Sequence, residues 1–202
     1  VAAGAYTLPA GTPATGFEVS SELSIIGAAA NGATETSIAV GAGVTAFALR
    51  SPRASLSLAG LRLRAVGPSP SPLVSLSSGA ALFASQARIE GGSEGVFAEG
   101  AGTQVTLDHV FVHAASSTSV RARLGASVVL RQSVIDSGAL AGVLIERGSL
   151  SAVETAVLSP GGEGIVFTGA PPRAGAIDRL DRVVVRSARG VKWNRRRAIV
   201  YF

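Results

Sequence analysis

The chain has 202 residues, a formal net charge of +5 and no cysteine. A chain of this length can bury about 70 % of the surface that its unfolded form exposes, so a sizeable core is expected. Without cysteine there are no disulfides, thiolate metal ligands or cysteine nucleophiles, and no stretch approaches the ~20 consecutive apolar residues that span a bilayer.

The composition favours a compact β-rich protein. Its apolar content comes from Ala, Val and Leu, and 25 glycines favour closely stacked backbone. The sequence contains no methionine, not even at its first position. We therefore expect residues 1–202 to form a single domain that is a mature portion or a fragment of a larger protein.

The first predicted strands precede a regular repeat. Segment 5–12, AYTLPAGT, is followed by segment 23–27, LSIIG, and by the alternating pair Phe47 and Leu49. Six similar copies then start 23 to 27 residues apart, at Ser55, Ala81, Gln104, Ser127, Leu150 and Ile177. Internal repeats of this period indicate a solenoid, in which each repeat is one supersecondary unit.

Each copy is predicted to contain strands with one inward face. In segment 104–113, QVTLDHVFVH, apolar residues alternate at Val105 and Leu107, and they alternate again after a two-residue step. A third alternating pair follows each copy, and glycine directly precedes four of these pairs, at Gly95, Gly142, Gly164 and Gly190. We therefore predict coils of three short strands with a bend at the two-residue step.

Coils of about 23 residues cannot bury their inner faces alone, but they share one core when they stack about 4.8 Å apart. The repeat, together with AYTLPAGT and LSIIG, resembles the parallel β-helices of the pectate-lyase-like superfold. The resemblance implies an all-β fold, a right-handed parallel β-helix (solenoid) of about seven to eight three-strand coils, and it says little about function. An antiparallel β-sandwich is the structural alternative, but it would not explain the constant register of consecutive copies.

Stacking places equivalent residues of successive coils in columns on the outer surface. Two columns alternate in charge, one at the first corner with Asp108, Arg131 and Glu154, the other on the third strand with Glu99, Arg123 and Glu146. We interpret them as ion pairs that set the register of the coils, with a charged binding site as the alternative.

The Asp108-His109 pair resembles a pair that pectate lyases carry in a similar apolar setting. Their companion motif, R-x-P-x-x-R, is incomplete here because Ser55 stands in place of the second arginine. No calcium-binding acidic cluster, paired catalytic aspartates or epimerase signature is visible. We interpret His109 as a corner residue rather than a general base, in a column formed by Gln86, His109, Gln132, Thr155 and Arg182.

One outer column supplies the catalytic candidates. Arg64, Glu90, His113 and Asp136 occupy the end of the second strand in successive coils. A histidine between two carboxylates has its charged form favoured and could act as an acid or base, although salt-linked surface residues make the same pattern. No cofactor and no metal site are expected.

An apolar stripe runs beside this column and supplies the binding candidates. The column of the stripe begins with Arg62 and Arg88 and continues in the next coils with Phe111, Val134, Val157 and Val184. Phe83 and Val129 lie on the neighbouring strand. A free monomer rarely exposes such a stripe, so we expect a partner subunit, another part of the parent protein or an elongated ligand to cover it. A wrong assignment of inward and outward positions in this strand is the alternative.

Basic residues crowd the last 17 residues, at Arg186, Arg189, Lys192, Arg195, Arg196 and Arg197. Such a run can hold an acidic glycan, a nucleic acid or a membrane surface, but aromatic interleaving is limited to Trp193 and Tyr201, so nucleic acid is not the expected partner. Neither end shows a cap helix, and segment 197–202, RAIVYF, could begin another strand. We therefore expect more protein, a partner or an unusual cap beyond the ends.

The leading hypothesis is a non-catalytic β-helical scaffold or binding module of a secreted or cell-surface protein, which contacts a polysaccharide or a protein partner along one face. The first alternative is a polysaccharide lyase or related carbohydrate-active enzyme centred on the catalytic candidates. The second is a subunit of a trimeric spike or fibre, whose contact surface would be the apolar stripe.

Overall fold

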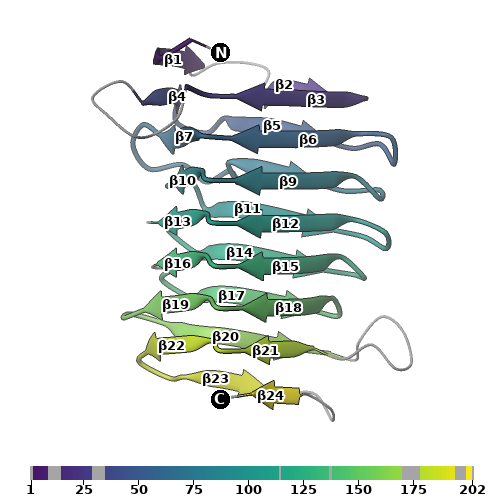
Figure 1. Ribbon diagram of the computed structural model, residues 1–202, viewed down its shortest axis with the longest axis vertical. Coiled ribbons are helices and arrows are strands. Elements are labelled where there is room, and N and C mark those ends of the chain that lie inside the picture. The colour runs from purple at the N-terminus through teal and green to yellow at the C-terminus, as the bar shows by residue number, and fades with distance from the viewer. Residues whose placement is uncertain are drawn as a thin grey trace.

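The computed structural model describes residues 2–8, 15–28, 35–113, 115–136, 138–169, 178–193 and 199–201. Within these ranges the chain forms 24 strands and no helix, and the strands make three parallel sheets of eight strands each. Consecutive strands belong to different sheets, so each strand pairs with the strand three further along the chain. The stack of turns in Figure 1 is therefore a parallel β-helix, as predicted.

We name the three sheets A, B and C. Sheet A contains β1 (Gly4–Leu8), β4 (Thr36–Val40), β7 (Leu61–Ala65), β10 (Arg88–Glu90), β13 (Phe111–His113), β16 (Val134–Asp136), β19 (Ala156–Ser159) and β22 (Val184–Ser187). Sheet B contains β2 (Thr15–Val19), β5 (Thr45–Leu49), β8 (Val74–Leu76), β11 (Glu94–Glu99), β14 (Thr118–Arg123), β17 (Ala141–Glu146), β20 (Glu163–Thr168) and β23 (Val191–Trp193). Sheet C contains β3 (Glu22–Ile26), β6 (Ser55–Ala59), β9 (Ala81–Ser85), β12 (Gln104–Asp108), β15 (Ser127–Arg131), β18 (Ser149–Val153), β21 (Arg179–Asp181) and β24 (Ile199–Tyr201).

The strands form a β-solenoid of about six turns, so the predicted count of seven to eight coils is slightly too high. The six aligned copies of the repeat correspond to the turns from β6–β8 to β21–β23, each passing through sheets C, A and B in that order. Strands β1–β5 and β24 extend the three sheets beyond these copies.

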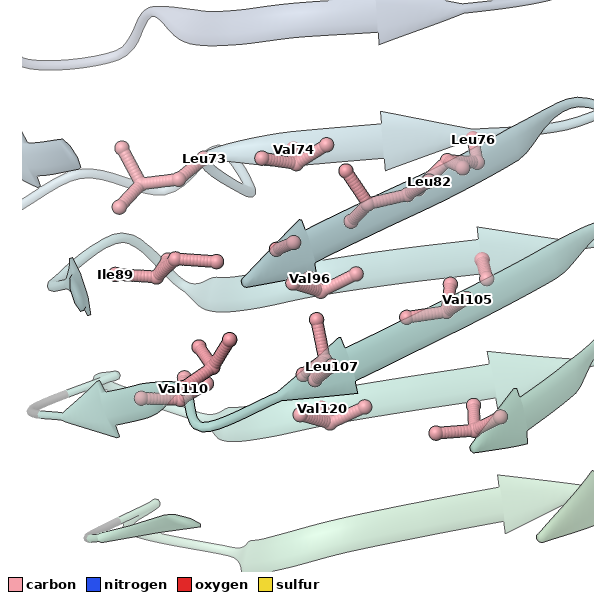
Figure 2. Packing of buried hydrophobic residues seen from close by; sticks show 14 of the residues in the cluster. Leu73, Val74, Leu76, Leu82, Ile89, Val96, Val105, Leu107, Val110 and Val120 are labelled. Carbon is pink, nitrogen blue, oxygen red and sulfur yellow. The ribbon is translucent and has the colours of Figure 1, made fainter. Parts of the chain in front are cut away.

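The interior is filled by apolar side chains from all three sheets. Leu107 of β12, Val112 of β13 and Val120 of β14 are fully buried, and they belong to one hydrophobic cluster that runs through successive turns. Figure 2 shows Leu107 and Val120 among the packed side chains of neighbouring turns. Because burying one such side chain contributes about 1.5–3 kcal/mol, the shared core is the main source of stability.

Glycine at the start of sheet B strands allows a close approach to sheet A. A Cβ atom at Gly142 would lie 2.6 Å from Cγ1 of Val157, and one at Gly164 would lie 2.3 Å from Cγ1 of Val185. Both distances are far below carbon–carbon contact distance, so a larger residue would push these strands away from the inward valines. The same contact, with Val112, occurs at Gly95, whereas a Cβ at Gly190 would meet no atom and that glycine instead has a positive φ of 67°.

The bend between sheets C and A uses a left-handed backbone conformation. The bend residue has positive φ in six successive turns, at Gly60, Gln86, His109, Gln132, Glu154 and Arg182. The predicted two-residue step is therefore a real corner, and His109 occupies it. The prediction of Thr155 in this column is wrong, because Glu154 holds the position.

The copy predicted to begin at Leu150 is displaced by one residue. Ser149 of β18 pairs with Ser127 of β15, because two residues connect β17 to β18 whereas three connect β14 to β15. A displacement of one residue exchanges the inward and outward faces of a strand. Val153 rather than Glu154 therefore lies beside Arg131, and the predicted charge column at the first corner is interrupted there.

Candidate functional site

The outer face of sheet A carries the four catalytic candidates. The register places Arg64, Glu90 and His113 at equivalent positions of β7, β10 and β13. Asp136 of β16 extends the column, because its Oδ2 lies 2.8 Å from Nδ1 of His113. The structure therefore brings together the four side chains that the sequence analysis grouped.

The carboxylate of Glu90 is held by arginines rather than by His113. Nε of Arg62 donates a 2.8 Å hydrogen bond to Glu90, and Nε of Arg88 lies 3.8 Å from its other oxygen. In the described part of the chain, His113 contacts the carboxylate of Asp136, and Arg64 forms no ion pair. The sequence predicted a histidine between two carboxylates, but in the structure His113 contacts one carboxylate, that of Asp136.

Phe111 packs between Arg88 and His113. The rings of Phe111 and His113 have centroids 5.5 Å apart and planes 19° apart, and the Arg88 guanidinium lies 5.3 Å from the Phe111 centroid. The side chains of His113 and Asp136 are 42 % and 25 % exposed. The pair is therefore an ordered, solvent-accessible imidazole and carboxylate that could exchange a proton with a bound molecule.

Most residues of the predicted apolar stripe face outward. On sheet A, Phe111 pairs with Val134, Val134 with Ala156, and Ala156 with Val184. The prediction of an outward Val157 is wrong, since its side chain is fully buried and Ala156 takes the outward position after the one-residue displacement. Phe83 is exposed on sheet C, but Thr106 separates it from Val129.

The Asp108-His109 pair lies at the exposed corner. Nδ1 of His109 lies 2.8 Å from Oδ1 of Asp108. The backbone of His109 is in the left-handed conformation. Farther along the corner, Nε2 of Gln132 donates a 2.9 Å hydrogen bond to Glu154, and Arg182 lies 2.7 Å from Glu154. Glu154 therefore links the side chains of Gln132 and Arg182, which occupy the same corner in the turns before and after it.

The outer face of sheet B has a hollow of about 330 Å³, which sequence reasoning missed. We call it the sheet B hollow, and its walls are formed by Thr45, Ala48, Arg50, Pro72, Ser75, Glu94, Phe97, Arg121 and Arg123. The guanidinium groups of Arg121 and Arg123 lie 5.8 and 5.1 Å from the centroid of the Phe97 ring. An aromatic ring and cationic groups therefore share one concave surface.

Carboxylates fix Arg121 and Arg123, two of the three arginines of the hollow. Nε of Arg121 donates a 2.7 Å hydrogen bond to Glu146, and a second nitrogen lies 3.4 Å from Glu94. Arg123 donates a 2.9 Å hydrogen bond to Glu99, as the predicted charge column on the third strand required. The pair Arg123–Glu146 is not formed, because Glu146 binds Arg121 instead.

The environment keeps Arg121 charged. Its hydrogen bond to Glu146 raises the pKa of its guanidinium, and this effect exceeds the lowering by burial. In Arg123, Nε is buried and has no hydrogen-bond partner, the one such side-chain atom in the described part of the chain. A buried donor without a partner is costly, so this nitrogen lowers the stability of the local structure.

Comparison with protein-family models, with curated proteins and with solved structures found no match. The described residues contain no group of three or more His, Cys, Asp or Glu side chains that could hold a metal ion. They also contain no helix that is long and apolar enough to cross a membrane.

The hollow arises from a size difference between neighbouring strands. Ala48 and Ser75 occupy the outward positions of β5 and β8, and Phe97 and Arg121 occupy the same column on β11 and β14. Two small side chains therefore lie beside two large ones. The alternation in the sequence predicts that this column faces outward, as it does for the charged column beside it, but it does not predict a hollow.

Proposed function

We propose that the chain is a non-catalytic module of a secreted or cell-surface protein and that it binds a polysaccharide through the sheet B hollow. The observation that carries this proposal is the hollow itself, in which the Phe97 ring lies beside arginines already ordered by carboxylates. Its volume of about 330 Å³ lies within the range of small-ligand sites.

A sugar ring suits this mixture of groups. Its hydroxyl groups can accept hydrogen bonds from guanidinium groups such as that of Arg123 and donate them to the carboxylate of Glu94, while its C–H surface can pack against Phe97 and Pro72. The hollow spans strands from four successive turns, so a polymer can follow the solenoid axis. Arginines that are already fixed lose little conformational entropy when they bind.

The proposal is tested by titration calorimetry with a panel of neutral and acidic polysaccharides. We expect at least one to bind, and we expect Phe97→Ala and Arg123→Gln each to weaken its binding by about tenfold. Phe83→Ala is the matched control, because Phe83 is an exposed phenylalanine on sheet C, away from the hollow. Lack of binding across the panel, or equal losses for Phe83→Ala and Phe97→Ala, would contradict the proposal.

The His113–Asp136 pair supports a second candidate function, a carbohydrate-active enzyme, because a carboxylate at 2.8 Å orients the imidazole for proton transfer. The pair lies on sheet A, outside the sheet B hollow. We therefore expect polysaccharides to stay intact when they are incubated with the protein, with or without calcium, and analysed by mass spectrometry. Shortened or unsaturated products that disappear in His113→Ala and Asp136→Ala would favour the enzyme instead.

A further inference from the structure

The outer face of sheet A has two chemically different halves. Arg62, Arg64 and Arg88 occupy outward positions of β7 and β10 beside Glu90, whereas the outward positions of β16 and β19 hold Val134, Ala156 and Leu158 together with Asp136. These strands lie one above another along the left side of Figure 1. The face is separate from the sheet B hollow, so an inference about it does not depend on polysaccharide binding.

The arginine half has more positive than negative charge. Arg62, Arg64 and Arg88 face outward there, and the carboxylates of Glu35 and Glu90 lie beside them. Both carboxylates are bound to Arg62, and Glu90 also contacts Arg88. Arg64 is exposed and forms no ion pair with the described residues, so it offers a free guanidinium.

The apolar half begins at Phe111 and continues to β22. Val134, Ala156 and Val184 follow Phe111 in one column, and the adjacent column holds Leu158 of β19 between Asp136 and Arg186. Val184 is 52 % exposed, and the other members are partly exposed. Apolar surface in a continuous row of four strands gains free energy when a partner covers it.

This combination disfavours two other occupants. A polysaccharide would bring hydroxyl groups onto the valines, where only His113, Asp136 and Arg186 of the adjacent column could replace a few of their bonds to water. A second copy of the chain would place the arginine half either against itself or against the apolar half. The first arrangement brings like charges together, and the second buries the unpaired Arg64.

We propose that the outer face of sheet A docks a polypeptide segment of a partner protein, apolar along one half and acidic at the end that meets Arg64. The face from β7 to β22 covers five strand spacings, about 24 Å, which corresponds to about 16 residues of helix. Carboxylates of the segment pair with Arg64, and its apolar residues cover Val134, Ala156 and Val184. Such a contact is small, so the complex is a weak, reversible one.

The test is selection of random 16-residue peptides displayed on phage against the folded protein. We expect the selected peptides to combine acidic with apolar residues. In fluorescence titrations they should bind about tenfold more weakly to Arg64→Glu and to Val134→Gln. Leu124→Gln, at an exposed apolar position between β14 of sheet B and β15 of sheet C, is the control and should bind as the unchanged protein does. Thermal unfolding establishes that all three variants fold.

Three outcomes would overturn the inference. The first is that the selected peptides contain no acidic residues. The second is that neither sheet A variant weakens their binding. The third is that the selection yields no peptide. Sedimentation of the protein without peptide tests whether a second copy of the chain occupies the face instead. Association of the protein with itself that Val134→Gln abolishes would assign the face to a second copy, as expected for a spike subunit, and would also refute the docking of a foreign segment.

Discussion

At the scale of single residues, the corner between sheets C and A stores backbone strain. Gln86, His109, Gln132, Glu154 and Arg182 all have φ between 45° and 53° there. A non-glycine residue with left-handed backbone costs roughly 1–2 kcal/mol, and asparagine tolerates it best because its side chain can bond locally. The corner is therefore where a surface substitution can raise stability.

Gln86 is the position at which to test this strain, because its side chain is exposed and its φ is 47°. We expect Gln86→Asn to stabilise the fold by about 0.5–1 kcal/mol and Gln86→Val to destabilise it by roughly 1–2 kcal/mol, measured by urea unfolding. Gln104→Val is the control, since Gln104 is exposed in a regular strand where valine is favoured. The same loss at both valine positions would show that the corner is not strained.

At the scale of strands, the sequence predicts which residues face inward but not the length of each connection. The alternation of Val105 and Leu107 in β12 follows directly from burial of one face, and both side chains are buried. The connection between β17 and β18 is one residue shorter than its equivalents, and the alternation of apolar residues does not reveal this. The alignment therefore predicted that Val157 faces outward. A connection can lose one residue without exposing the core, which is why periodicity alone could not detect it.

The candidate sites were predictable to different degrees for the same reason. A column such as Glu90 and His113 follows from register, so the sequence could group its members. Register does not determine which of several neighbours a long side chain contacts, and Glu90 binds Arg62 instead of His113. The sheet B hollow depends on differences in side-chain size between four strands, and repeat alignment does not measure this property.

At the scale of the whole molecule, one core runs through all the turns, and each turn contacts its neighbours above and below. Val157 belongs to this core, between Ile135 and Val185 of the adjacent turns. A polar group placed there would therefore disturb three turns at once. Ala156, one residue earlier, faces outward and contacts the same strands.

These two neighbours provide a test of the whole stack. We expect Val157→Asp to lower the free energy of unfolding by about 4 kcal/mol or more, because the carboxylate would be buried without a partner. Ala156→Asp should change it by about 1 kcal/mol or less, because that carboxylate stays in contact with water. Thermal and urea unfolding of both variants measures the difference. A larger loss for Ala156→Asp would mean that β19 has the opposite face toward the core, and the shared interior described for turns β15 to β23 would then be wrong.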